Sequence, residues 1–516
     1  MMLASCLGVK PYFSSGTKNG FCCRASDKQI HIDGLRNNDR KKVVVVGSGW
    51  AGLGAAHHLS KQGFNVTVIA DATDDAGIRG FFYPFRNIFS LVDELGIKPF
   101  TEWTKSAQYS GDGLEVEFPI FQDQPQLPTP FGTLLYAQFI RLPVLDRLTS
   151  LPLMAACKSS VVLQQLWECC IILYSGTRFD RLILSHEAAE YNGNKIRHTI
   201  SIEREGFRYA IVPWDCKREI FNPWMGALRE KGCQVMDGET VTDLIFDEET
   251  GQISEVACSK KLYKADAVIL AVGISTLQEI IKSRQEFLKV MNLAGIDVLS
   301  VKLQINRRVQ IPNASNACTY LDDSSGWTFF DLSNLDVHKD DPVTALQADF
   351  YYANELLLLS DELIIAKVMT YLSKVHQDFE NVAVTNKVVG RYPKSLSHFF
   401  PGFCHLKWSL ALKFTSPFHF CPTGSYKFMM RGSTSFPNLF MGGDWIVTRH
   451  GSWLQEKSYV TGLEAANRVV DFLEEGSFAK IIPVEEDEPH IQVLRSLNRN
   501  LNRILDELPW SKYFLQ

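Results

Sequence analysis

The feature that most constrains the fold is a glycine-rich turn near the start of the chain, at residues 47–52. It lies within KKVVVVGSGWAGLGAAHHLSKQGFNVTVIAD, residues 41–71. The four valines before the turn are typical of a parallel strand buried on both faces, and an apolar helical pattern follows the turn. A second strand, FNVTVIA, comes after that helix. This order of strand, turn, helix and strand predicts the opening unit of a dinucleotide-binding α/β domain.

The residue types in the turn suit contact with a pyrophosphate. Gly47 permits the tight turn, Gly49 lets the phosphates approach the backbone, and Gly52 lets the helix pack closely against the strand. The helix start also offers N–H donors to an anion. The alternative is that the glycines serve only a tight turn. The predicted cofactor contacts of the turn are Gly47, Ser48, Gly49, Trp50, Ala51 and Gly52.

An acidic side chain at the end of the second strand normally binds the ribose of a dinucleotide. The usual spacing falls on Ala70, and Asp71 comes one residue later. Asp71 is therefore the predicted ribose ligand, and the alternative is a solvated turn residue.

Further strands of dinucleotide-domain character lie much later in the chain. Residues 232–273 predict a strand, a hairpin with its turn at 247–251, and a buried apolar strand, ADAVILAVG. Residues 438–447, NLFMGGDWIV, predict another strand that ends on two glycines and Asp444, before a helix whose N-terminus is expected near residues 460–463. Such a corner offers a carboxylate to hydroxyl groups and a helix N-terminus to negative charge. A flavin dinucleotide needs both, because it carries a polyhydroxy chain and a ring that becomes electron-rich on reduction, so the sequence predicts FAD.

Length, charge and cysteine pattern narrow the class of protein. A chain of 516 residues predicts two or three domains. The net charge of −5 argues against a nucleic-acid-binding protein, which carries a basic surplus. The 12 cysteines contain no C-x-x-C pair, so we expect neither a metal site nor a disulfide framework. No apolar stretch is long enough to predict a membrane-spanning helix.

Residues 1–40 differ in composition from the rest of the chain. They contain Lys10, Lys18 and Arg24 but no acidic residue before Asp27, together with several serines and small residues. This composition predicts an organelle transit peptide, and the alternative is a disordered extension.

Three stretches resemble the FAD-dependent amine oxidase and phytoene desaturase superfamily, and within it the plant carotenoid desaturases. The first is VVVVGSGWAGLGAAHHL. The second, GIRGFFYPFRNIFSLVDELGI at residues 77–97, is similar to the desaturase pattern G-L-H-x-F-F-G-x-Y-x-N-x-x-x-L-x-x-E-L-G. The third, FMGGDW followed by EKSYVTG, is similar to A-G-D-Y and E-G-A-x-x-S-G. The likeness extends in patches from about residue 41 to residue 476.

The resemblance assigns roles to residues outside the first turn. Gly443 and Asp444 would bind the region of FAD between pyrophosphate and ribityl chain. Val241 would meet the adenine through its backbone. Gly462 and Leu463 would face the N1–C2 carbonyl edge of the flavin.

The resemblance also implies a reaction. A lipophilic, carotenoid-like substrate would be dehydrogenated by hydride transfer to flavin N5, with a quinone or oxygen as electron acceptor, in the chloroplast. No catalytic residue is predicted, because no acid–base group stands out. The alternatives are an amine oxidase-type flavoenzyme and an FAD-binding protein that has lost turnover.

The chain departs from the family pattern in several places. The G-G-[R/K] loop after the second strand is missing, and E-G-A is replaced by Glu456, Lys457 and Ser458. Lys457 either acts on the reduced flavin or oxygen, or is simply solvated. Residues 157–206 and 402–424 fit no family pattern, so the substrate domain is either divergent or damaged.

The predicted fold class is α/β, with a Rossmann-like FAD-binding domain built from discontinuous segments and a mixed α+β substrate domain. A helix with Ser360 as its N-cap is predicted to end near Val375, and Phe350 is assigned to core packing or to a substrate pocket. The last segment predicts an acidic linker and an amphipathic helix, which packs on the protein or contacts a membrane surface. The predicted segments are 41–76, 207–275 and 430–476 for the FAD-binding domain, 77–206 and 276–429 for the substrate domain, and 477–516 for the linker and last helix.

Overall fold

The structure is a computed structural model. It describes residues 40–70, 80–82, 85–102, 106–110, 113–118, 209–212, 216–281, 285–318, 327–333, 342–351, 353–398, 428–448, 450, 454–483 and 493. Asp71, both atypical segments, the transit peptide before Arg40 and nearly all of the last helix lie outside the described residues, so those predictions stay untested.

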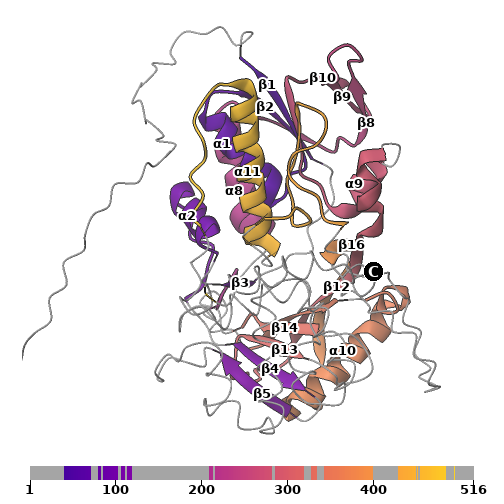
Figure 1. Cartoon of the computed structure of the whole chain (residues 1–516). Coiled ribbons are helices and arrows are strands. Elements are labelled where there is room, and N and C mark those ends of the chain that lie inside the picture. Colours follow the sequence, from indigo (N-terminus) through magenta and orange to yellow (C-terminus); the bar gives the residue numbers. More distant parts are fainter. Residues whose placement is uncertain are drawn as a thin grey trace, which may run out of the picture. The chain divides into compact units, whose positions relative to one another are not determined.

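A five-stranded parallel sheet forms the centre of the first lobe, with strand order β17-β11-β1-β2-β7. Figure 1 labels β1 and β2 of this sheet. The four valines of β1 are buried and pair in parallel with β11 on one side and β2 on the other. The predicted assembly of this domain from three distant segments is confirmed, because each segment supplies at least one strand. The strands are β1 (Lys42–Val46), β2 (Asn65–Ala70), β7 (Gln234–Asp237), β11 (Ala267–Leu270) and β17 (Leu439–Met441).

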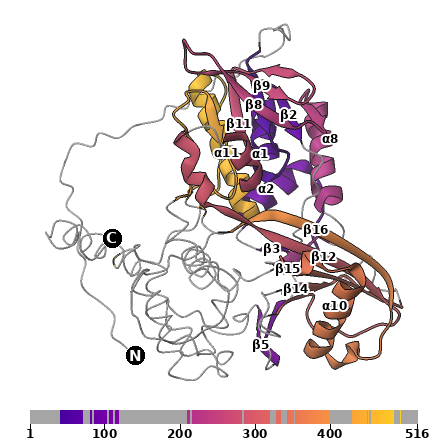
Figure 2. The ribbon, with the colours of Figure 1, turned by 90° about the vertical axis from the view of Figure 1, so that its right-hand side faces the viewer.

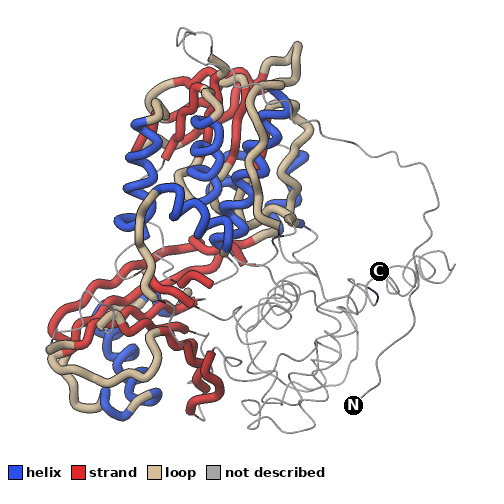
Figure 3. The backbone as a smooth tube through the Cα atoms, turned by 90° about the vertical axis from the view of Figure 1, so that its left-hand side faces the viewer, coloured by secondary structure: helices blue, strands red, loops and turns tan. Residues whose placement is uncertain are grey.

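Helices cover one face of this sheet, as Figure 3 shows in blue. Val43 and Val45 point toward this face and share a core with the helices, because side chains alternate along a strand. The helices are α1 (Trp50–Lys61), α2 (Arg86–Leu95), α8 (Asn222–Glu230) and α11 (Leu454–Leu473), and the π-helix Lys217–Phe221 leads into α8.

The predicted boundary at residue 77 is wrong for α2. Ile88, Leu91 and Val92 of this helix are buried in the core under the parallel sheet, and α2 contacts both α8 and α11. Their spacing forms one apolar stripe, which the sequence shows, but the partner of that stripe is decided by tertiary contacts.

The opposite face of the parallel sheet carries a small antiparallel sheet and two short helices. Val44 and Val46 lie in this second core. The predicted hairpin turn is confirmed, since the Gly251 N–H donates to the Asp247 carbonyl at 2.9 Å. The predicted boundary at residue 275 is also wrong, because Leu277 and Phe287 pack in this core. The elements are β8 (Val241–Phe246), β9 (Ile253–Cys258), β10 (Leu262–Lys264), α9 (Ile274–Ile281) and the 3-10 helix Gln285–Asn292.

The second lobe is built on a seven-stranded sheet with the order β16-β12-β15-β14-β13-β4-β5, antiparallel except between β13 and β4 (Figure 2). One face packs on α10 (Asp361–Val375). The predicted N-cap is confirmed, because the Ser360 hydroxyl accepts from the Leu363 N–H. Phe350 stacks on Trp327 in this core, which confirms the packing alternative for that residue. The strands are β4 (Ser106–Ser110), β5 (Gly113–Phe118), β12 (Ala294–Ile305), β13 (Ser315–Cys318), β14 (Trp327–Asp331), β15 (Thr344–Tyr351) and β16 (Val384–His398), and the 3-10 helices Leu356–Leu358 and Gln377–Phe379 flank α10.

A two-stranded sheet of β3 (Gly80–Phe82) and β6 (Tyr209–Ile211) contacts elements of both lobes. Phe81 packs edge-on against Trp50 of α1. Ile211 packs on Phe330 and Leu332, at the face of the seven-stranded sheet that is turned away from α10. That face is therefore the one nearer to the dinucleotide lobe.

Within the described part of the chain, no helix combines the length and apolarity needed to cross a membrane. The same residues contain no cluster of His, Cys, Asp and Glu that fits a metal ion.

Candidate functional site

The glycine-rich turn after β1 has the geometry expected for a phosphate site. Gly47 has φ of +113°, and a Cβ there would overlap the Ala271 carbonyl oxygen. A Cβ at Gly52 would overlap the Gly47 carbonyl, so these two glycines are required by backbone packing. A Cβ at Gly49 would meet nothing within 4 Å, and no side chain caps the first turn of α1. Among the described residues, the start of α1 is therefore uncapped and has room beside Gly49, which fits an anion bound to backbone N–H groups.

Ser48 and Trp50 of the turn differ in how far their side chains are buried. Ser48 is half-buried. The Trp50 indole packs on Phe221 at 5.0 Å between ring centroids, inside the core. Only the backbone of Trp50 therefore stays a predicted cofactor contact.

The Gly442-Gly443-Asp444 corner lies beside this turn, although 390 residues separate the two in sequence. The Gly442 N–H donates to the Leu270 carbonyl at 3.0 Å, which sets the corner next to the end of β11. A Cβ at Gly442 would lie 3.4 Å from the Ala51 Cβ, so the corner meets the start of α1 directly. The structure thus brings the two predicted halves of one site together.

Thr461 of α11 holds the corner in place. Its hydroxyl accepts from the Gly443 N–H at 2.9 Å and lies 3.0 Å from the Gly443 carbonyl, to which it donates. Gly443 has φ of +141°, a conformation that favours glycine. The following residue, Trp445, is buried and donates from its indole to the Val272 carbonyl. These contacts on both sides fix the backbone of Asp444, whose side chain is half-buried.

The predicted helix N-terminus near residues 460–463 is wrong. The helix α11 already includes Leu454, so Gly462 and Leu463 lie in its interior. A Cβ at Gly462 would overlap the Ala51 carbonyl, and Leu463 is buried in the helix-covered core. Gly462 is a close-packing glycine between α1 and α11, and in the sequence it resembled a helix start. Gly462 and Leu463 were predicted to face the flavin edge from the start of a helix. Because the helix starts earlier, no free N–H groups of a helix end are available at these two residues.

Glu456, in the first turn of α11, caps another helix. Its carboxylate accepts from the Asn87 N–H at 2.9 Å, the Ile88 N–H at 3.0 Å and the Asn87 side-chain amide at 2.7 Å. Burial raises the pKa of Glu456 to about 7, while these three donors act in the opposite direction.

Lys457 is buried, so the prediction that it is a solvated side chain is wrong. Burial lowers the pKa of its ammonium to about 8, and the nearby charge of Asp444 acts in the opposite direction. A buried amine therefore lies close to the carboxylate predicted to bind the ribityl region.

Val241 begins β8 on the other face of the parallel sheet, and its side chain is half-buried opposite Cys258. The loop just before it, at Gly238, donates an N–H to the Ala70 carbonyl at the end of β2. Its adenine contact stays a prediction.

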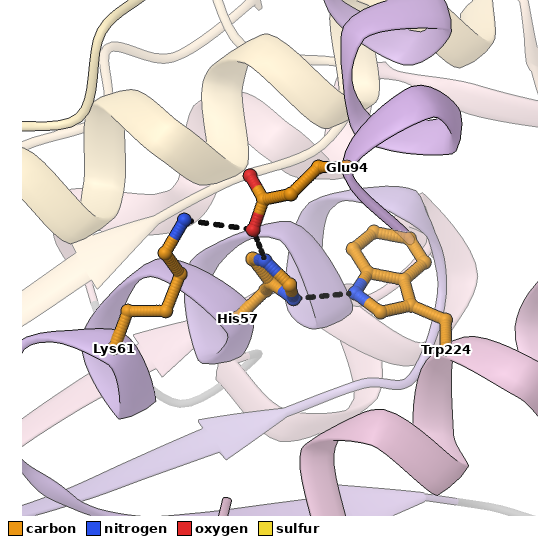
Figure 4. A network of polar contacts seen from close by, with 4 residues as sticks. All are labelled: His57, Lys61, Glu94 and Trp224. Carbon is orange, nitrogen blue, oxygen red and sulfur yellow. Dashed lines mark hydrogen bonds and ion pairs between the residues drawn. The ribbon is translucent and has the colours of Figure 1, made fainter. Parts of the chain in front are cut away.

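A polar network that the sequence did not predict links side chains of α1 to side chains of two neighbouring helices (Figure 4). The Trp224 indole donates to His57 Nδ1 at 3.1 Å, and His57 Nε2 lies 2.8 Å from the Glu94 carboxylate. The ammonium of Lys61 donates a hydrogen bond to the same carboxylate. Burial lowers the pKa of His57, although Glu94 acts in the opposite direction. The neutral ring with its proton on Nε2 satisfies both partners, so the network joins α1, α2 and α8.

The seven-stranded sheet presents buried polar side chains on the face turned away from α10. Asp349 is buried, accepts from the Ser300 hydroxyl at 2.5 Å and from Gln347, and pairs in register with Thr328. Tyr351 is on the same face, 3.5 Å from Thr328. The alternation in TALQADFY signals this face, since leucine, alanine and phenylalanine point to the core while glutamine and aspartate point away.

Two family descriptions match the chain. Residues 45–102 match "NAD(P)-binding Rossmann-like domain", and residues 225–470 match "Flavin containing amine oxidoreductase".

Solved structures of similar fold cover most of the chain. A putative protoporphyrinogen oxidase from Exiguobacterium sp. 255-15 has a TM-score of 0.60 at 12% identity, covering 86% of this chain and 100% of that one. Cyclohexylamine oxidase from Brevibacterium oxydans IH-35A has a TM-score of 0.56 at 14% identity, covering 84% and 100%. At these identities the likeness shows the fold alone.

Relatives in sequence match only in part. Lysine-specific histone demethylase 1 homolog 3 of Arabidopsis thaliana is 47% identical over 58 residues, which is 11% of this chain and 3% of that protein. Protein anon-37Cs of Drosophila melanogaster is 42% identical over 79 residues, which is 15% of this chain and 14% of that protein.

The geometry suits the cofactor that these families imply. The open backbone at Gly49 and the corner at Asp444 meet the two needs of a flavin dinucleotide, an anion site and a hydroxyl-binding carboxylate. Residues 225–470 are thus similar to the flavin containing amine oxidoreductase family and residues 45–102 to a Rossmann-like domain. Together these matches support an FAD-dependent oxidoreductase whose cofactor is FAD.

Proposed function

We propose that this chain oxidises an amine-type substrate. The observation that carries the proposal is the buried polar face of the seven-stranded sheet, centred on Asp349. A hydrocarbon polyene gains nothing from a buried carboxylate, whereas a substrate ammonium group offers it a charge and hydrogen-bond donors. The match of residues 225–470 to the flavin containing amine oxidoreductase family supports the same class of substrate.

We assign one set of residues to binding FAD and another to binding the substrate. The backbone at Gly49 and the start of α1 would hold the pyrophosphate, and Asp444 would receive hydroxyl groups. Asp349, held by Ser300 and Gln347, would orient the substrate's amine. The chemistry that bound FAD would supply is oxidation of the substrate carbon by hydride acceptance, with oxygen or a quinone as the proposed final acceptor of the electrons.

Anaerobic mixing tests this proposal. We expect primary or secondary amines to bleach the flavin absorbance of the FAD-loaded protein, and carotenes to leave it unchanged. Asp349→Asn keeps the shape of the side chain but removes its charge, so it should slow reduction by amines about tenfold or more without loss of FAD. Asp378→Asn is the matched control, because that carboxylate is exposed on the same lobe. Equal reduction rates in both variants would remove Asp349 from the proposal.

A lipophilic, carotenoid-like substrate is the second proposal. It is supported by the similarity of residues 77–97 to the desaturase pattern. Bleaching by a carotene, but not by amines, would favour it. A protein that binds FAD and is reduced by neither class would favour a chain that has lost turnover.

The surroundings of the enzyme are proposals as well. We propose oxygen or a quinone as the electron acceptor, no contact with nucleic acid and a chloroplast location, each as an expectation from the sequence. Peripheral contact of the last helix with membranes is proposed beside the alternative that this helix packs on the protein. Import of a fluorescent protein fused to residues 1–40 into isolated chloroplasts tests the location, and retention of that fusion outside them would contradict it.

A further inference from the structure

Glu239 is a buried carboxylate with an unsatisfied oxygen. The residue is 5% exposed, and its Oε2 has no hydrogen-bond partner. The other oxygen, Oε1, lies 3.8 Å from the ammonium of Lys260, an exposed side chain. A buried carboxylate oxygen without a partner is costly, and a ligand that donates to it removes that cost.

Glu239 lies at the carboxyl end of the parallel sheet, beside the end of β2. The N–H groups of Gly238 and Glu239 both donate to the Ala70 carbonyl, at 2.9 and 3.3 Å. On the other side of the same strand end, the Gly47 N–H donates to the Ile69 carbonyl at 2.8 Å. The phosphate turn and Glu239 therefore flank the last two residues of β2.

The strand itself ends without a carboxylate, because the position that normally supplies the ribose ligand is Ala70. A dinucleotide whose pyrophosphate lies on the Gly47 turn extends its adenosine ribose across this strand end. The two ribose hydroxyls are donors that need an acceptor there.

We propose that Glu239 receives the hydroxyl groups of the adenosine ribose of FAD, so that the end of β7 supplies the ligand in place of the end of β2. The inference rests on the assignment of FAD as cofactor. Gly238 has φ of +70°, and this turn places the carboxylate immediately after β7. Asp71 is the rival ligand. If Glu239 is the ligand, Glu239→Gln weakens FAD binding, and if Asp71 is the ligand, Asp71→Asn weakens it.

Binding of FAD to the apoprotein is the test, compared with FAD analogues whose adenosine ribose lacks the 2′- or the 3′-hydroxyl. Glu239→Gln should weaken FAD binding about ten- to hundredfold, because it removes a charge-assisted hydrogen bond. Wild type should discriminate against at least one analogue, and Glu239→Gln should not. The apoprotein of Glu239→Gln should melt no lower than wild type, since the substitution removes an unsatisfied buried charge.

The matched variants separate the possible failures. Glu249→Gln, at the exposed hairpin turn of the neighbouring sheet, should bind FAD as wild type does. Loss of discrimination in Asp71→Asn, with full discrimination kept in Glu239→Gln, would overturn the proposal in favour of Asp71. A wild-type chain that binds neither FAD nor its analogues would overturn the cofactor and this inference together.

Discussion

At the scale of single residues, position 462 is a glycine because the Ala51 carbonyl occupies the space that a side chain would need. The contact joins α1 to α11 where the two halves of the dinucleotide site meet. Gly462→Ala should therefore lower the free energy of unfolding by about 1–3 kcal/mol, the usual cost of overpacking. It should also reduce FAD retention, because the start of α1 must move.

Gly226 of α8 provides the control, with the opposite expected sign. A Cβ there would meet nothing within 4 Å, so Gly226→Ala should raise stability by up to about 1 kcal/mol through helix propensity. Urea unfolding and the FAD content of the purified protein measure both effects. A Gly462→Ala variant as stable as wild type would mean that the helices separate there at little cost.

At the scale of elements, the first turn of α2 is capped by a side chain of α11, 368 positions away in the sequence. Glu456→Ala leaves the N–H groups of Asn87 and Ile88 without their acceptor. Loss of a cap whose donors are buried should cost about 2 kcal/mol in urea unfolding. Glu475→Ala, an exposed acid just after α11, should change stability little. Equal stability of the two variants would show that water replaces the cap.

The same contact explains why the domain boundary at residue 77 could not be read from the sequence. The apolar stripe of α2 predicts an amphipathic helix but does not name the surface it covers. Glu456 and the core around Ile88 decide that surface, and both depend on residues brought from the other end of the chain.

At the scale of the whole molecule, stability should depend on pH through the network of His57. The folded pKa of this ring is below its ordinary value of 6.5, so the folded state binds fewer protons than the unfolded chain. The contribution of His57 to stability is therefore complete above pH 6.5 and is lost as the pH falls. Glu94 acts similarly at lower pH: Lys61 and His57 overcome the effect of burial and lower its pKa to about 2, so its contribution is lost between its ordinary 4.5 and that value.

The comparison of wild type with His57→Asn isolates this effect. Asparagine keeps an acceptor for the Trp224 indole but does not titrate. We expect wild type to be the more stable protein at pH 8, and the difference to shrink at pH 5.5. Urea unfolding at the two pH values measures it, and a difference independent of pH would contradict the role of His57. The raised pKa of Glu456 has the opposite effect on stability, because its contribution is present below pH 4.5 and is lost as the pH rises through about 7. Wild type and His57→Asn share this contribution, so it cancels in the difference between their free energies of unfolding.

Several parts of the fold were predictable because their causes are local. The hairpin turn at 247–251, the N-cap at Ser360 and the contact of Gly52 with the Gly47 carbonyl each depend on neighbours only a few residues away. Periodicity and turn chemistry record such causes directly. The corner at Asp444 was also recognisable as a candidate cofactor contact, because a strand that ends on two glycines and an acid is a local pattern.

By itself, then, the sequence determined a Rossmann-like α/β lobe assembled from distant segments, with FAD as its cofactor. It also predicted the residues at the two corners where the phosphates and the hydroxyl groups would bind. Only the tertiary structure decided that Lys457 is buried, that Gly462 is a packing residue, that Glu239 lies at the end of β2 and that Asp349 lies on the inner face of a sheet. The physical reason is that burial and an unsatisfied hydrogen bond are properties of contacts between segments. No stretch of sequence carries them until the chain brings those segments together.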